Sequence, residues 1–427
     1  MTGASEASGR EQAISELERQ LNPQHPLVTL ATTIDWSSFE ESFGRTVSSA
    51  GGRHALPTRL MVGLHYLKSV YNESDESVVM KWVENPYWQY FCGEETFQHE
   101  LPCHPTSLVK WRTFIGVEGM ETLLKEILKT AMRMGALNAK DIERVNVDTT
   151  VQEKAIAFPT DARLYDKARR TLVKAARTRD IPLRQSYVRV GKQALFQQSR
   201  YRVARQLNRA RKHTRKLRTY LGRVIRDIER KFPQPDTVMQ TLLERATQIF
   251  QQQRNDTNKL YSIHAPEVEC IAKGNVHKRY EFGCKVVLVT TSQTNWIVGA
   301  MAVHGNPYDG ATLVGAIEQP HRLSGQHPQQ ASVDQGFRGQ SYHPPGLTVL
   351  VAGTRRLAGA LRRWLKRRSA IEPVISHAKH DHGLNRNYLK GTHGDCINTL
   401  LAACGFNLRK LWRFLHDLHS SSPTLAA

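Results

Sequence analysis

Three acidic residues lie where a folded chain could bring their carboxylates together. Asp148 ends a predicted strand in VNVDTT, Asp334 ends another in SVDQGF, and Glu372 lies in a predicted helix in RRSAIEPVISHAK. Carboxylates at strand ends, with a third on a nearby helix, can converge at one edge of a sheet. Oxygen-only sites of this kind suit Mg²⁺ or Mn²⁺, and two such ions support in-line displacement at a phosphodiester.

Each acid alone also has an ordinary structural explanation. A strand-end Asp such as Asp334, before a Gln-Gly pair, commonly forms a turn with its own backbone, and a helical Glu usually faces solvent. Arg368 and Lys379 favour the metal hypothesis, because they lie four residues before and seven after Glu372 and project from nearly the same helical face. Pro373 predicts either a kink or the first turn of a new helix.

The positive charge of the chain is concentrated in one segment. The 427 residues include 60 Lys and Arg against 39 Asp and Glu, a net charge of +21. Residues 161–231 hold 23 of these cations and 5 of the acids, a net of +18. Such a segment predicts a polyanionic partner, either nucleic acid or an anionic membrane surface. No stretch reaches the ~18 apolar residues of a spanning helix, and no apolar signal region opens the chain, so we expect a cytoplasmic protein that does not bind membranes.

The basic segment is predicted to be helical. Residues 193–231 contain no Pro and one Gly, and Leu195, Val203, Leu207, Leu217, Leu221, Ile225 and Ile228 recur at roughly helical spacing. One narrow apolar stripe would let the helix pack while its cations face outward. We expect phosphate contacts from Arg209, Arg211, Lys212, Arg215 and Lys216. The alternative is a solvated charged helix without a ligand.

The remaining pattern predicts an α/β fold with a mixed sheet. Residues 10–137 read as short helices, at 59–71, from 75, from about 107 and at 120–135, which suit a helix-turn-helix DNA binder or an ordinary bundle equally. Strands are expected at 145–151, 280–291, 296–304, 331–334 and 348–352, with a helix at 312–319 and a long one opening near Leu357. The six cysteines are scattered without zinc-site spacing, which predicts reduced thiols and no structural zinc.

These motifs resemble the DDE transposases of bacterial insertion sequences, in particular the large insertion-sequence family number five. The resemblance runs from about residue 25 to 416 and rests on VNVDTTV, on D-x-G-F at Asp334 followed by Arg338, on R-x3-E-x6-K at Arg368, Glu372 and Lys379, and on HDHGLNRNYLKGTHGD. It implies that Asp148, Asp334 and Glu372 hold two Mg²⁺ ions (or Mn²⁺ as substitute). It implies further that Arg368 and Lys379 contact DNA, and that the core is ribonuclease H-like. We also expect Arg338 to contact DNA.

The resemblance also has departures. The related signature places Tyr three residues before the Arg, where this chain has Leu365 beside Trp364. The basic segment falls between Asp148 and Asp334, whereas many relatives enlarge the loop between the second Asp and the Glu. Other acids near these motifs, Asp309, Asp381 and Asp395, are weaker candidates for the site.

The predicted organisation follows from both lines of reasoning. It comprises a flexible N-terminus (1–24), a helical DNA-end-binding domain (25–138), a ribonuclease H-like catalytic domain (139–160 and 260–416), a basic helical insertion (161–259) and a flexible tail (417–427). The expected protein is a bacterial, nucleoid-associated transposase that acts on double-stranded DNA, at the element ends and the target, as a homodimer or larger assembly. The alternatives are a nuclease that cuts without joining, a catalytically inactive DNA-binding relic and an RNA-binding protein.

Overall fold

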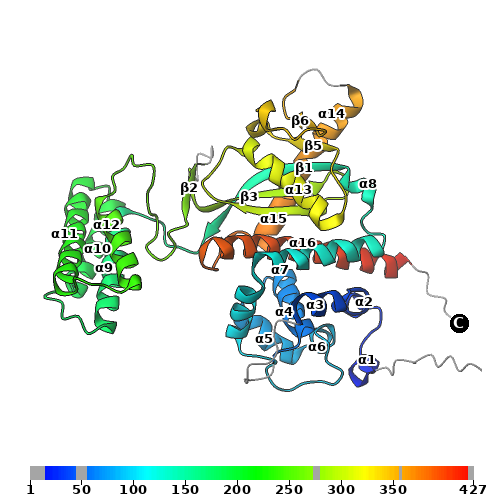
Figure 1. Cartoon of the computed structure of the whole chain (residues 1–427), viewed down its shortest axis with the longest axis horizontal. Helices are drawn as coiled ribbons and strands as arrows, with labels where there is room; N and C mark the ends of the chain where they lie inside the picture. Colours follow the sequence, from blue (N-terminus) through cyan, green and yellow to red (C-terminus); the bar gives the residue numbers. More distant parts are fainter. Residues whose placement is uncertain (1–14, 45–54, 273–278, 355–357, 422–427) are drawn as a thin grey trace, which may run out of the picture.

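A seven-stranded mixed sheet lies at the centre of the structure (Figure 1). The computed structural model describes residues 15–44, 55–272, 279–354 and 358–421. The strands are β1 (Arg144–Lys154), β2 (Glu269–Ala272), β3 (Tyr280–Thr291), β4 (Ile297–Val303), β5 (Gln330–Val333), β6 (Thr348–Val351) and β7 (Arg386–Asn387). The predicted strands are thereby confirmed, and β2 and β7 are additions that their short, weakly patterned sequences did not signal.

The sheet is antiparallel on one side of β1 and parallel on the other. β3 pairs antiparallel with β1, β2 and β4, whereas β5 pairs parallel with β1, and β6 pairs parallel with β5. The short β7 pairs parallel with the far end of β1. The long apolar run of β3 is buried along nearly its whole length, as expected for a central strand covered on both faces. The mixed α/β class expected from the sequence is confirmed.

Eight helices precede the sheet in the part of the chain that the structure describes. They are α1 (Glu16–Gln20), α2 (Pro26–Thr33), α3 (Trp36–Phe43), α4 (Thr58–Tyr71), α5 (Asp75–Glu84), α6 (Pro86–Phe91), α7 (Pro105–Arg133) and α8 (Ala139–Ile142). Ser74 begins α5 through a capping box with Ser77. The two helices expected around residues 107 and 120 form the two halves of α7, which bends at Gly116, where φ is +63°. Only glycine adopts this backbone conformation readily.

The N-terminal helices share a hydrophobic core with the sheet. One continuous cluster joins Leu64 and Leu67 of α4 and Leu124 of α7 to Val147 of β1. It also includes Cys404 of the long C-terminal helix α16 (Gly391–Ser421). Part of the expected flexible N-terminus is ordered as well: residues 16–20 form α1, and Leu17 is buried because it packs into this cluster. The expected flexible tail is likewise shortened, since α16 continues to Ser421.

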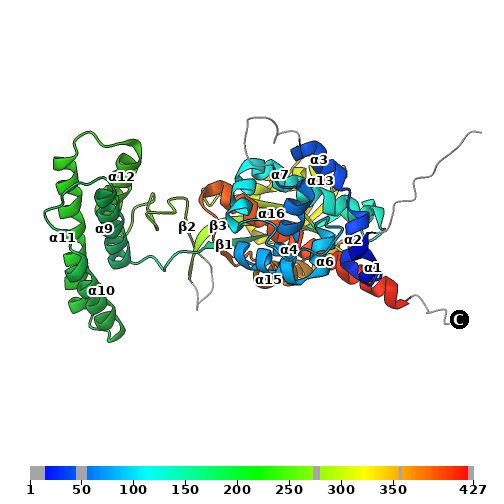
Figure 2. The same ribbon diagram turned by 90° about the horizontal axis from the view of Figure 1, so that it is seen from below.

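The basic segment forms a separate four-helix unit that stands away from the sheet (Figures 1 and 2). Its helices are α9 (Asp161–Thr178), α10 (Val188–Val203), α11 (Leu207–Lys231) and α12 (Thr237–Gln251), and they enclose their own core. The single helix expected over 193–231 is wrong, because the chain turns between α10 and α11 at Arg205, where φ is +55°. Val203 and Leu207 consequently lie exposed at this turn, outside the apolar stripe assigned to them.

The segment that carries Glu372 consists of three short elements. These elements follow β6 and are α14 (Gly359–Lys366), the 3-10 helix η5 (Arg367–Ala370) and α15 (Ile371–Asp381). A separate helix, α13 (Leu313–Ser324), lies earlier in the chain, between β4 and β5. The long helix expected from Leu357 is therefore interrupted, and Leu357 itself lies outside the described residues. Pro373 sits in the first turn of α15, the position that tolerates proline best.

Candidate metal and DNA site

The register of the sheet places two of the predicted acids side by side. Asn146 of β1 lies opposite Ser332 of β5 in the parallel pair. Two residues later come Asp148, within β1, and Asp334, directly after β5. Asp148 does not end its strand, as the sequence suggested, because β1 continues to Lys154 along β3. Asp334 directly follows β5 and accepts a hydrogen bond from the Gly336 N–H at 2.8 Å, which is the turn role also expected for it.

Glu372, the third predicted acid, is linked to Asp148 by Arg368, which contacts both carboxylates. Nη1 of Arg368 lies 3.1 Å from Oδ2 of Asp148, and its Nη2 lies 3.7 Å from Oε1 of Glu372. Asp148 is largely buried, whereas the Glu372 side chain is 64% exposed. Asp148 and Glu372 thus flank one arginine, with Glu372 on the solvent side, and the charge of Asp334 lies near Asp148.

Two residues that sequence reasoning missed hold η5 against the sheet. The buried side chain of Asn146 donates a hydrogen bond to the Arg367 carbonyl at 3.2 Å. Arg367 in turn donates to the carbonyls of Ser292 and Gln293 in the β3–β4 turn, at 2.9 and 3.0 Å. Asn146 alternates with Asp148 on β1, and that spacing in VNVDTT was the one available signal.

The electrostatic environment of Asp148 is mixed. Burial raises the pKa of its carboxyl, a hydrogen bond from the Thr149 N–H and the charge of Arg368 lower it, and the nearby charge of Asp334 raises it again. The balance is a pKa above the ordinary value. A buried carboxylate beside a second carboxylate is stabilised by a bound cation, and Arg368 supplies a positive charge at this position.

A fourth carboxylate, Asp309, lies beside Asp334. A Cβ atom on Gly336 would lie 2.7 Å from Oδ2 of Asp309 and 2.9 Å from Oδ1 of Asp334, so the two acids crowd the same glycine. Asp309 is ion-paired with the nearly buried Lys285 of β3 at 2.7 Å. This pairing explains how Asp309 can lie so close to Asp334, and it gives Asp309 a cation of its own.

The predicted DNA contacts lie in three places. Arg338 is exposed just after the short turn that contains Gly336, and Lys379 lies two turns along α15 from Glu372. The basic residues Arg209, Arg211, Lys212, Arg215 and Lys216 are all exposed on α11. Among the described residues none of these five on α11 forms an ion pair with a carboxylate. The structure therefore leaves their charge available to an anionic partner.

A further cationic surface was not predicted from the sequence. A cleft of about 1070 Å³ opens between the C-terminal end of α15, α16 and the β3–β4 turn. Arg409 lies over the rings of Tyr71 and Trp412, and Lys410 lies over Trp296. Neither cation, nor the neighbouring Arg413, forms an ion pair with a carboxylate in the described parts of the chain. The arrangement of aromatic rings and cations suits an anionic, ring-bearing ligand.

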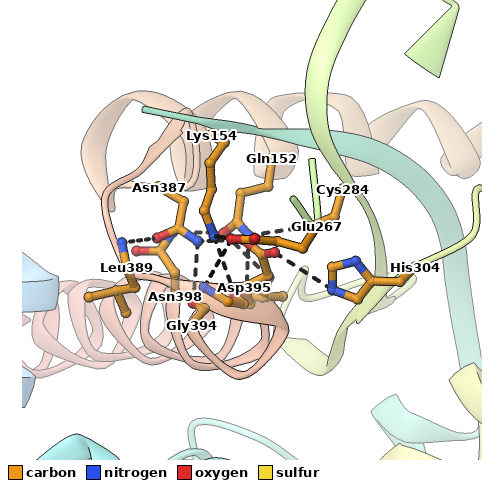
Figure 3. A network of polar contacts seen from close by, with 12 residues as sticks. Gln152, Lys154, Glu267, Cys284, His304, Asn387, Leu389, Gly394, Asp395 and Asn398 are labelled. Carbon is orange, nitrogen blue, oxygen red and sulfur yellow. Dashed lines mark hydrogen bonds and ion pairs between the residues drawn. The ribbon is translucent and has the colours of Figure 1, made fainter. Parts of the chain in front are cut away.

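The other two weaker candidates, Asp381 and Asp395, fall outside the acid cluster. Asp381 contacts His377 at 2.7 Å on the exposed side of α15, and Asp395 belongs to a separate buried network (Figure 3). His382, directly after α15, is buried, and its Nδ1 lies 3.0 Å from the Ser69 carbonyl. Its role is to join α15 to α4.

Comparisons with known proteins address this region directly. Residues 15–114 match the family described as Transposase domain (DUF772), and residues 354–412 match the family described as Transposase DDE domain. The second range contains Arg368, Glu372 and Lys379, whereas Asp148 and Asp334 lie outside both ranges. No solved structure matches the chain.

The chain is also similar to one curated protein of unassigned function. The uncharacterized protein ORF8 in the nfe locus of Rhizobium meliloti is 53% identical over 190 residues, which cover 44% of this chain and 91% of that protein. No helix among the described residues has the length and apolar character needed to cross a membrane. Proteins with a DDE transposase domain generally depend on divalent metal ions. The two domain matches support a DDE-type transposase of an insertion element.

Proposed function

We propose that this transposase binds the terminal inverted repeats of its element, cuts the DNA there and joins the freed 3′-hydroxyl to target DNA. The observation that carries the proposal is that Asp148 and Glu372 flank Arg368, with Asp334 close to Asp148 at the end of the neighbouring strand. The antiparallel and parallel halves of the sheet support a ribonuclease H-like core, and the R-x3-E-x6-K spacing supports membership of insertion-sequence family number five. The proposed domains keep the boundaries expected from the sequence, apart from the ordered residues 16–24 and 417–421.

The three acids fit a pair of Mg²⁺ or Mn²⁺ ions. They offer oxygen ligands only, and the buried Asp148 already attracts a cationic group in Arg368. When bound, such ions activate the attacking water or 3′-hydroxyl and stabilise the leaving oxygen. Asp148 and Asp334 provide rigid ligands from the sheet, while Glu372, largely exposed on α15, faces the incoming DNA.

The cations around the acids would position the DNA backbone. Arg368 and Lys379 lie on the Glu372 segment and would contact phosphates near the cut, and Arg338 would do so from the opposite turn. The N-terminal helices would read the inverted repeats, and the α11 face would hold flanking DNA farther from the acids. We expect a homodimer or larger assembly on double-stranded DNA, because two ends must be cut and joined together.

A cleavage and strand-transfer assay tests the proposal. The purified chain with Mg²⁺ or Mn²⁺ receives duplex DNA carrying the flanking ends of its own gene, alongside Glu372→Gln and the exposed control Glu318→Gln on α13. We expect nicked and joined products from the parent and the control, and neither from Glu372→Gln, which should still bind DNA. Cutting without joining would identify a nuclease. Binding without cutting by the parent would identify a DNA-binding relic, and preference for competing RNA would identify an RNA-binding protein.

A further inference from the structure

A second group of potential metal ligands lies on the sheet and is shown in Figure 3. Cys284 of β3, His304 after β4 and Asp395 near the start of α16 each present one ligand atom, and these atoms lie within 4.8 Å of one another. Cys284 pairs with Gln152, which lies four residues beyond Asp148 on β1. Four strand residues span about 13 Å, so the two sites are distinct.

The ligand atoms of this group lack strong partners of their own among the described residues. His304 Nε2 is buried without a hydrogen-bond partner there and lies 3.6 Å from Oδ2 of Asp395. Oδ1 of Asp395 accepts hydrogen bonds from Lys154 and Asn387 at 2.9 and 2.6 Å, which leaves Oδ2 turned toward His304. Cys284 Sγ receives a long contact of 3.5 Å from the Gln152 amide. Three ligand atoms therefore converge with lone pairs that a cation could use.

Residues around the three proposed ligands hold the ligand side chains in position, as neighbouring residues do in known metal sites. Oε1 of Glu269 lies 3.5 Å from Nδ1 of His304 and is itself fixed by the Gly305 N–H at 2.6 Å. A carboxylate at Nδ1 keeps the proton there and leaves Nε2 as the ligand atom. Lys154 is balanced by Glu267 at 2.9 Å as well as by Asp395, so its charge is shared by two carboxylates.

The ligand types select a class of cation. A thiolate and an imidazole favour Zn²⁺ and similar transition metals over Mg²⁺, and three protein ligands leave a fourth position for water. We propose that Cys284, His304 and Asp395 bind one zinc-class divalent cation, which ties β3, β4 and the start of α16 together. Binding breaks the S–H bond of Cys284, forms the metal–sulfur bond and releases one proton to solvent.

The proposal revises the expectation of no structural zinc. That expectation rested on the spacing of the cysteines, and this site uses a single cysteine with partners 20 and 111 residues further along the chain. Only the pairing of β3 with β4 and the docking of α16 bring them together. Burial raises the pKa of the Cys284 thiol, and the charge of Asp395 raises it further. Affinity should consequently increase with pH.

Cobalt binding to the full-length chain tests the site, and its readout does not depend on DNA cleavage. The chelator-treated protein is titrated with Co²⁺ at pH 8, and the near-ultraviolet absorption of a cobalt–thiolate bond is recorded. We expect one equivalent to bind and Zn²⁺ to displace it, while a large excess of Mg²⁺ does not. We expect Zn²⁺ also to raise the melting temperature, because a ligand of the folded state stabilises it.

Variants separate this site from other thiols. Cys284→Ser should lose the absorption, and the matched control Cys270→Ser on β2 should keep it. His304→Gln is a second variant at a less buried position, in case Cys284→Ser fails to fold, and it should weaken Co²⁺ binding at least tenfold. Absence of the thiolate band in the parent, or its survival in both site variants, would overturn the proposal and identify the group as a hydrogen-bond network.

Discussion

Arg368 and Asp148 form an ion pair at the centre of the acid cluster, with Nη1 of the arginine 3.1 Å from Oδ2 of the aspartate. The other guanidinium nitrogen faces Glu372 at 3.7 Å. Arg368 therefore places positive charge between two residues proposed as metal ligands. When metal ions and DNA bind, the Arg368 guanidinium must either stay beside carboxylates that also bind the ions or move toward a DNA phosphate.

This relationship predicts the effect of removing the arginine. Arg368→Ala should bind Mn²⁺ roughly fivefold more tightly in the absence of DNA, because about 1 kcal/mol of competing attraction disappears. The same variant should bind DNA ends more weakly. Mn²⁺ titration followed by electron paramagnetic resonance measures the first effect, and Arg363→Ala on exposed α14 is the control. Unchanged Mn²⁺ affinity would show that Arg368 does not compete for the acids.

The sequence predicted much of this site because its signals were local. Alternation placed Asp148 and Asp334 on strands, and the R-x3-E-x6-K spacing placed Arg368 close to Glu372, as the structure shows. Asn146 could not be recognised, and Asp309 could be named only as a weaker candidate, since their roles depend on η5 and Lys285, which lie far away in the chain. Local periodicity can assign a residue to a helix or strand, but it does not show which residue far away in the chain contacts it.

The break between α10 and α11 shows the same limit in the fold. Residues 204–206 contain neither proline nor glycine, so propensity favoured one continuous helix across them. The chain turns at Arg205 because α10 then packs beside α11 and α9, around the separate core of the insertion. Tertiary burial outweighs helix propensity there.

The α11 face should carry the salt-sensitive part of DNA binding. Replacing Arg209, Arg211, Lys212, Arg215 and Lys216 by Gln should reduce the slope of log K against log salt by about 0.9 for each DNA phosphate that these cations no longer neutralise. Fluorescence anisotropy of a labelled duplex across a KCl series measures the slope. The control replaces five exposed cations of α9, Arg163, Lys167, Arg170, Lys174 and Arg177. Equal effects from both sets would contradict a specific role for α11.

The N-terminal helices should lose stability in mild acid. Burial, with a smaller contribution from Arg112, lowers the pKa of His65 to about 3. Burial of Asp75 is outweighed by Arg112 and Lys68, so its pKa is about 2. Both values lie below those of the unfolded chain, about 6.5 and 3.8. The unfolded state therefore binds more protons, and stability falls as pH drops, from 6.5 toward 3 for His65 and from 3.8 toward 2 for Asp75.

Hydrogen exchange measures this loss locally. Between pH 7.5 and pH 5, the opening free energy of residues 58–91 should decrease by about 2 kcal/mol after correction for intrinsic exchange rates. His65→Gln removes the titrating group and should flatten the pH dependence, even if its stability is lower throughout. The exposed His99→Gln should behave like the parent. A parent without pH dependence over this interval would contradict a neutral, buried His65.

The close approach of α16 to α4 should be intolerant of a single added methyl group. A Cβ atom on Gly405 would lie 2.3 Å from the Ser69 carbonyl oxygen and 2.8 Å from Nδ1 of His382. The Ser69 backbone and the buried His382 ring cannot move away easily. Gly405→Ala should therefore push α16 away from α4 and lower the free energy of unfolding by about 1–3 kcal/mol or more. Gly359→Ala at the start of α14 meets no atom of the described residues within 4 Å and should be neutral or slightly stabilising. The melting temperatures of both variants, measured by thermal denaturation, test this prediction. If Gly405→Ala melts at the same temperature as the parent, α16 does not need this close approach to hold the N-terminal helices on the sheet.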